Sequence, residues 1–250
     1  MSKYKNNQEF LDSMKTRKDV LGEDLDNFYI NVVETNRLIG LTLDVLPEED
    51  LPALIETYKN LLEDEQEELE EAMEKQNPTE VVKEAIDVLV IGGYLWYLYT
   101  GYTYNYTICY ETDPKDLRDT GLADLQRILM TTTTLLFEVS ATMNVSKALE
   151  LVVDENLRKF PTTEDMKYRY MIVNEAGRLE YQSNLEEVLA KEILSIESQG
   201  RYSGVYYKKV LDRYGHERVV LWCTHEYGKE KKKYLKPTAW KKGDFNSIVL

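Results

Sequence analysis

The chain has 250 residues, of which 43% are hydrophobic and 30% charged, and its formal net charge is −14. Nineteen tyrosines, five phenylalanines and three tryptophans exclude a wholly disordered chain. Two cysteines exclude a disulfide framework and favour a reducing, cytoplasmic compartment. The acidity argues against a protein that binds nucleic acid over its whole surface.

Helical periodicity dominates the first two thirds of the chain, and shorter alternating segments follow Pro161. We expect a mainly α protein with a helical-bundle core in residues 1–163 and a small mixed or β-rich appendage in residues 164–250. The predicted helices of the core are 24–39, 51–76, 77–99, 122–143 and 146–160. The appendage is predicted to hold a hairpin over 168–181, a helix over 185–198, and a second hairpin formed by 202–211 and 218–223.

Charge is divided between the two parts of the chain. Residues 41–90 contain 16 acidic and 3 basic side chains, whereas residues 201–250 contain 5 acidic and 12 basic ones. This contrast indicates an acidic core and a basic tail with separate roles.

The segment 88–110 carries no charge over 23 residues. Only 88–99 is densely apolar, which is about half of the ~20 residues that a membrane-spanning helix needs. We therefore expect a buried or subunit-interface helix and no membrane span. Gly92 and Gly93 inside it would permit close helix packing.

The helix predicted over 51–76 has an acidic anomaly. A helical wheel places Glu65 in the middle of the apolar stripe and Glu68 at its edge. A carboxylate in that position must be paired, neutral or bound to a cation. The other glutamates of the run are expected on a solvated face. The stripe itself consists of Leu54, Tyr58, Leu62, Leu69, Ala72 and Met73.

The next helix repeats the anomaly. Residues 77–80 form a start signal, with Asn77 as the cap and Pro78 in the first turn. Glu84 and Asp87 are three residues apart and share a face. Asp87 is followed almost entirely by apolar residues, so we expect it to be buried.

An antiparallel arrangement of these two helices brings the carboxylates together. Glu65 and Glu68 lie about as far before the turn near residue 76 as Glu84 and Asp87 lie after it, at ~1.5 Å per residue. Four carboxylates in an apolar seam call for hard divalent cations, and an all-oxygen set favours Mg²⁺ or Mn²⁺ over Zn²⁺. Both histidines, at 216 and 225, are in the appendage.

These residues resemble the paired motif of the all-α NTP pyrophosphohydrolases, which include MazG-like proteins, dimeric dUTPases, dCTPases and phosphoribosyl-ATP pyrophosphohydrolases. The family pattern is Glu-Glu-x-x-Glu, a spacer, and Glu-x-x-Asp. Two registers compete for the first half. Glu67-Glu68-x-x-Glu71 matches the letters, whereas Asp64-Glu65-x-x-Glu68 departs by one Asp but is followed by the usual apolar residue, Leu69. The helical wheel selects the second.

A further likeness is the segment 154–160, which is similar to the Asn-x-x-Lys-Phe segment that closes the family's helical core. The resemblance implies that Asn156 and Lys159 face the substrate phosphates. It covers about residues 24–160. The tyrosine-rich stretch 94–110 and the segment up to 121 depart from the family pattern.

The resemblance implies hydrolysis of a nucleoside or deoxynucleoside triphosphate to the monophosphate and pyrophosphate. Glu65, Glu68, Glu84 and Asp87 would hold Mg²⁺, or Mn²⁺ in its place, and the carboxylates would serve as catalytic residues. Family members share a helical bundle between subunits, so a homodimer or homotetramer is implied.

Other functions stay open. The chain could be a non-catalytic binding module that keeps the fold, or a structural bundle whose carboxylates pair with Lys or Arg. The basic tail, with lysines around Tyr234 and Trp240, could contact nucleic acid or another phosphate-rich ligand. Docking on acidic helices of the same chain or of a partner subunit is the interpretation we favour for the tail.

Overall fold

A computed structural model describes residues 7–106, 120–181 and 184–250 of the chain. Contacts divide it into two compact units. We call Met1–Val33, Thr42–Val153 and Gly243–Leu250 the helical unit, and Glu34–Leu41 with Asp154–Lys242 the sheet unit.

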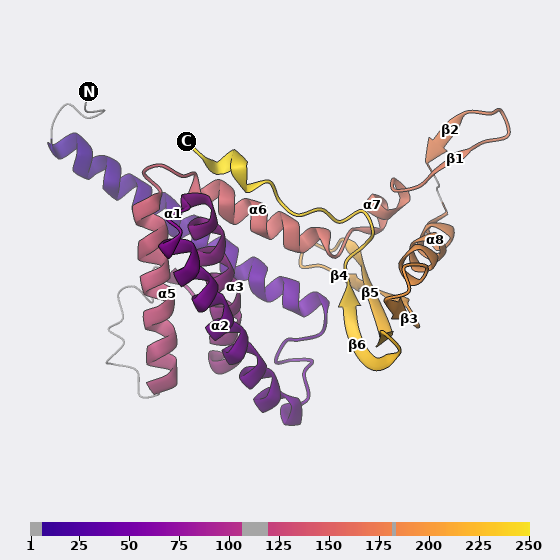
Figure 1. The fold of residues 1–250 in the computed structure, drawn as a ribbon, viewed down its shortest axis with the longest axis horizontal. Helices are drawn as coiled ribbons and strands as arrows, with labels where there is room; N and C mark the ends of the chain where they lie inside the picture. Colours follow the sequence, from indigo (N-terminus) through magenta and orange to yellow (C-terminus); the bar gives the residue numbers. More distant parts are fainter. Residues whose placement is uncertain (1–6, 107–119, 182–183) are drawn as a thin grey trace. The chain divides into compact units, whose positions relative to one another are not determined.

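The helical unit is built from long helices, coloured indigo to pink in Figure 1. Helices α2, α3, α5 and α6 agree with the sequence prediction to within a few residues, whereas α1 begins well before residue 24. The ends of α1 and α6 extend into the sheet unit. The elements are α1 (Asn7–Leu38), a 3-10 turn η1 (Glu48–Asp50), α2 (Leu51–Glu74), α3 (Pro78–Thr100), α5 (Thr120–Val139) and α6 (Val145–Arg158).

Helices α2 and α3 form an antiparallel hairpin. Chain reversal is achieved by Gln76, whose backbone is left-handed at φ 54°, and by Asn77, whose side chain accepts a hydrogen bond from the Glu80 backbone N–H at 3.5 Å. Pro78 occupies the first turn of α3, as predicted. The hairpin therefore fixes which residues of the two helices face each other.

Helix α3 packs against both α2 and α5 and is buried along most of its length. A Cβ atom on Gly93 would lie 2.4 Å from the ring of Tyr29, and one on Gly92 would lie 2.8 Å from Leu129. The prediction that these glycines permit close packing is confirmed. Within the described ranges, no helix is both long and apolar enough to cross a membrane.

The sheet unit contains two short helices, a small hairpin and a four-stranded antiparallel sheet. In this sheet β5 is central, with β3 and β4 along one edge and β6 along the other. The elements are α7 (Thr163–Lys167), β1 (Met171–Val173), β2 (Leu179–Tyr181), α8 (Leu185–Glu197), β3 (Tyr202–Ser203), β4 (Tyr206–Leu211), β5 (Glu217–Glu226) and β6 (Lys229–Leu235).

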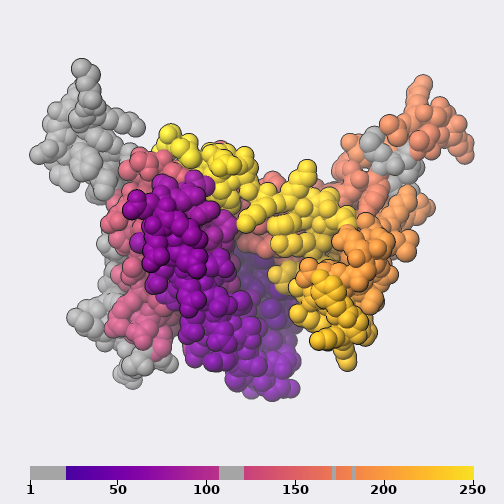
Figure 2. Space-filling view, viewed as in Figure 1, coloured from indigo at the N-terminus to yellow at the C-terminus, as the bar shows by residue number. Residues whose placement is uncertain are grey.

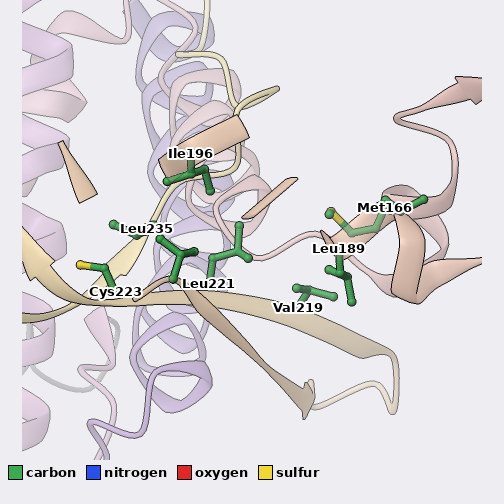
Figure 3. Packing of buried hydrophobic residues seen from close by; sticks show 9 residues of the cluster. Met166, Leu189, Ile196, Val219, Leu221, Cys223 and Leu235 are labelled. Carbon is green, nitrogen blue, oxygen red and sulfur yellow. The ribbon is translucent and has the colours of Figure 1, made fainter. Parts of the chain in front are cut away.

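One face of this sheet packs on α8. Figure 3 shows side chains of that core gathered along the strand that carries Val219, Leu221 and Cys223. Alternate residues of β5 supply it, and Val220 on the opposite face packs against Leu38 and Phe160. The core on the α8 side includes Met166, Val188, Leu189, Ile196, Val219, Leu221, Cys223 and Leu235.

The division of the chain differs from the predicted boundary between residues 163 and 164. Residues 154–163 join the sheet unit because the Val219 N–H donates to the Pro161 carbonyl at 2.8 Å and the Arg218 guanidinium donates to the Phe160 carbonyl at 2.8 Å. Residues 243–250, which include η3 (Phe245–Ile248), return to the helical unit, where the Asn144 N–H donates to the Ile248 carbonyl at 2.7 Å.

Candidate metal centre

Helices α2 and α3 bring three carboxylates together. Glu65 comes from α2, and Glu84 and Asp87 come from one face of α3. Each offers an oxygen, and these oxygens all lie within 4.8 Å of one another. All three side chains are partly buried. We call Glu65, Glu84 and Asp87 the carboxylate cluster.

Glu68, the fourth predicted residue, lies outside the cluster. Its side chain is exposed, although its charge acts on Glu65. The competing register is less well placed, since Glu67 and Glu71 are exposed and Glu71 accepts a hydrogen bond from Lys75 at 3.0 Å. Most of the acidic run on α2 is a solvated face, as expected, and the surface of α2 (purple) is seen in Figure 2.

The cluster perturbs the ionisation of Glu65. The pKa of Glu65 is raised from 4.5 to about 7 by burial, which is the largest cause, together with the charges of Asp87, Glu68 and Glu84, and against the opposing charge of Lys83. Within the described residues, Glu65 forms no ion pair and the buried Oε2 atom of Glu84 has no hydrogen-bond partner. The cluster therefore has unsatisfied acceptor capacity, which suits a hard divalent cation.

Lys83 is the basic residue beside the cluster, and sequence reasoning did not weigh it. Its Nζ atom lies 2.5 Å from Glu84 Oε1 and 3.3 Å from Asp87 Oδ2. Burial opposes the charge of Lys83, yet the hydrogen bond to Glu84 and the charges of Asp87 and Glu84 raise its pKa overall. The Lys83 ammonium group thus contacts two of the three carboxylates of the cluster.

Asn156 and Lys159, the two predicted phosphate-binding residues, belong to the sheet unit, whereas the cluster belongs to the helical unit. The Lys159 ammonium donates to Asn156 Oδ1 at 2.6 Å. Asn156 and Lys159 are therefore in direct contact with each other.

The tyrosines and tryptophan of α3 are packing residues. Tyr94 is fully buried, with its ring centroid 4.6 Å from that of Tyr58. Trp96 is 8% exposed and meets Tyr104 edge to face at 5.0 Å. Both rings therefore contribute to the packing of the helical unit. Cys109 and the end of the tyrosine-rich stretch lie outside the described residues.

A groove between α2 and α5 was not anticipated from the sequence. It encloses about 600 Å³, and Leu69, Met73, Ile128 and Leu135 form its apolar walls. Met73 was predicted to be in the core but is 48% exposed, because α2 meets α3 along a narrower stripe than the helical wheel suggests. Thr131, Thr132 and Thr134 on α5 supply much of the polar lining, and this threonine-rich stretch is the sequence feature that could have indicated the groove.

Comparisons with protein-family models, with curated proteins and with solved structures find no match for this chain. The resemblance to the all-α NTP pyrophosphohydrolases therefore rests on the motif residues alone.

Proposed function

We propose that this protein is a metal-dependent pyrophosphohydrolase that converts a nucleoside or deoxynucleoside triphosphate to the monophosphate and pyrophosphate. The observation that carries the proposal is the convergence of Glu65, Glu84 and Asp87 from two helices, with their oxygens within 4.8 Å of one another. The motif resemblance supplies the reaction.

The donor set fits Mg²⁺, with Mn²⁺ as the alternative, because every ligand is a carboxylate oxygen and, among the residues that the structure describes, Lys83 supplies the positive charge at the site. A divalent cation bound there would neutralise phosphate charge and would lower the pKa of an attacking water molecule. Glu65, Glu84 and Asp87 would bind that cation from two rigid helices.

Glu68 has a different role in this proposal. It is exposed and lies outside the cluster, one helical turn after Glu65. It is thus available to orient the attacking water and to accept its proton. Asn156 and Lys159 keep the phosphate-binding role that the resemblance implies, as a prediction.

The test is pyrophosphate release from a panel of NTPs and dNTPs in Mg²⁺, Mn²⁺ or EDTA. Glu84→Gln and Asp87→Asn should each abolish turnover, because each removes a charged ligand while keeping the side-chain size. Glu67→Gln is the matched control, since Glu67 is exposed on the same helix and outside the cluster. Metal-dependent turnover that survives only in the control supports the proposal, and absence of turnover on every nucleotide refutes it.

Lys83 supports a second candidate, a structural bundle without catalysis. In this candidate the cluster has only a structural role, which is to form ion pairs between Lys83 and the carboxylates of Glu84 and Asp87. On that account Lys83→Met removes the cation that contacts Glu84 and Asp87 and destabilises the protein by about 3–5 kcal/mol, with or without Mg²⁺. On the metal-site account Mg²⁺ restores the stability of the Lys83→Met protein.

A further inference from the structure

The sheet face that points away from α8 carries a row of aromatic side chains. Tyr206 on β4 is paired with Trp222 on β5, and Trp222 is paired with Tyr234 on β6. Because side chains alternate along a strand, these three share the face of Val220, while Val219 and Leu221 point to α8. Tyr206, Trp222 and Tyr234 are each partly buried. Trp222 and Tyr234 also pack against the core that contains Val220, and the indole nitrogen of Trp222 is buried.

The two ends of the aromatic row have different packing neighbours. The ring of Tyr234 packs against Phe160 at a centroid distance of 5.6 Å and meets Trp222 edge to face at 6.4 Å. Tyr234 therefore holds Trp222 in place from the covered end of the row. At the other end of the row, Tyr206 is paired with Trp222 across β4 and β5.

Lysines border the same face. Lys208 on β4 and Lys232 on β6 are each two residues from a ring of the row and are exposed. The Lys232 ammonium lies 5.5 Å from the Trp222 ring centroid. Lys236 follows at the end of β6, with its ammonium 3.5 Å from the centroid of Trp240.

The two faces of the sheet differ in how their lysines are neutralised. On the α8 side, Lys209 pairs with Glu217 at 3.5 Å, and Lys231 pairs with Glu226 at 2.9 Å. On the aromatic side, within the described parts of the chain, Lys208, Lys232 and Lys236 have no carboxylate at ion-pairing distance. The uncompensated positive charge is thus beside the rings.

We propose that this face binds single-stranded nucleic acid, with bases stacked on Tyr206 and Trp222 and phosphates held by Lys208, Lys232 and Lys236. Aromatic rings bordered by cations are the elements that recognise unpaired bases and their backbone. Double-stranded nucleic acid fits this face less well, because its base faces are stacked inside the duplex. An acidic protein segment also fits less well, because it would contact the lysines but not the aromatic rings. The face shares no residue with the carboxylate cluster, so this proposal is independent of the proposed hydrolysis.

The test uses the full-length protein and fluorescein-labelled oligonucleotides of about 15 nucleotides, dT and rU, a length that covers one stacking site. The oligonucleotides carry 5′-hydroxyl ends, and EDTA is present, so that the carboxylate cluster takes no part. Binding is followed by anisotropy at low and moderate salt, because phosphate contacts make it salt-dependent. Comparing dT with rU tells which kind of strand the face prefers, and binding of either supports the proposal.

Two double variants separate this face from general charge. Lys208→Gln/Lys232→Gln and Lys209→Gln/Lys231→Gln remove the same charge from the same two strands but on opposite faces. The first should weaken binding about tenfold or more, and the second should leave it within about threefold. Tyr206→Ala should weaken binding at least about fivefold, whereas Tyr206→Phe keeps the ring and should restore it.

Three results would overturn the proposal. These are no binding of either oligonucleotide at low salt, equal losses in the two double variants, and inorganic polyphosphate competing as well as the oligonucleotide at equal charge. Circular dichroism of each variant establishes that the fold is retained.

Discussion

Replacing Glu65 by Gln removes the least compensated charge of the carboxylate cluster. Burial, with the charges of Asp87, Glu68 and Glu84, raises the pKa of Glu65 from 4.5 to about 7. A carboxyl group whose pKa is higher in the folded state favours folding below its unfolded pKa, and this contribution is lost as the pH rises through the folded pKa. The metal-free wild type should therefore lose stability between about pH 4.5 and pH 7.

The magnitude follows from that shift. A change from 4.5 to about 7 corresponds to about 3 kcal/mol at most, and solvent screening of a half-buried group reduces it to about 1–2 kcal/mol. In EDTA at pH 8, Glu65→Gln should be more stable than the wild type by this amount. Near pH 5 the difference should fall below about 1 kcal/mol.

Urea denaturation in EDTA at pH 5 and pH 8 measures both differences. Glu67→Gln serves as the control, because an exposed glutamate outside the cluster should change stability by less than about 0.5 kcal/mol. If Glu65→Gln is the less stable protein at pH 8, the carboxylate of Glu65 is stabilised in the fold by a positive partner and the reasoning is refuted.

Two predictions concern packing and the sheet unit. Gly93→Ala places a methyl group against the buried ring of Tyr29 and should destabilise the protein by about 1–3 kcal/mol in thermal unfolding, whereas Gly92→Ala meets a flexible leucine end and should cost less; equal costs would contradict the packing account. For Asp212, burial opposes ionisation, but hydrogen bonds from Arg218 and from backbone N–H groups lower its pKa to about 2. Its stabilising contribution is present above about pH 4 and lost as the pH falls toward 2, so Asp212→Asn should be destabilised by about 2–4 kcal/mol at pH 7 and should lose this acid dependence in urea denaturation. An unchanged acid profile in Asp212→Asn would refute that assignment.

The sequence was informative where one local pattern decides the outcome. Glu65 stands out because a charge in an apolar stripe has a single geometric meaning on a helix, and Glu84 and Asp87 follow from their spacing of three residues. Glu68 was less certain, since it lies at the edge of the stripe, where a small rotation of α2 moves a side chain from the seam to solvent. The contacts of Lys83 were predictable in part, because Lys83 and Asp87 are four residues apart on one helix.

Strand β6 was missed because its lysines are unfavourable for strands in general. Those same lysines suit an edge strand, where charge opposes pairing with another chain. The row formed by Tyr206, Trp222 and Tyr234 depends on the register of three strands, which no local pattern determines. The assignment of residues 154–163 to the sheet unit depends equally on long-range contacts, such as that of Arg218 with the Phe160 carbonyl.

The central claim is that Glu65, Glu84 and Asp87 hold a divalent cation, and calorimetric titration of the metal-free protein with Mn²⁺ tests it most directly. The account predicts saturable binding that is competed by Mg²⁺, lost in Glu84→Gln and Asp87→Asn, and retained in Glu67→Gln. The account is contradicted if Mn²⁺ does not bind, or if it binds equally well to the wild type and the three variants. Lys83 would then be the cation that the cluster binds.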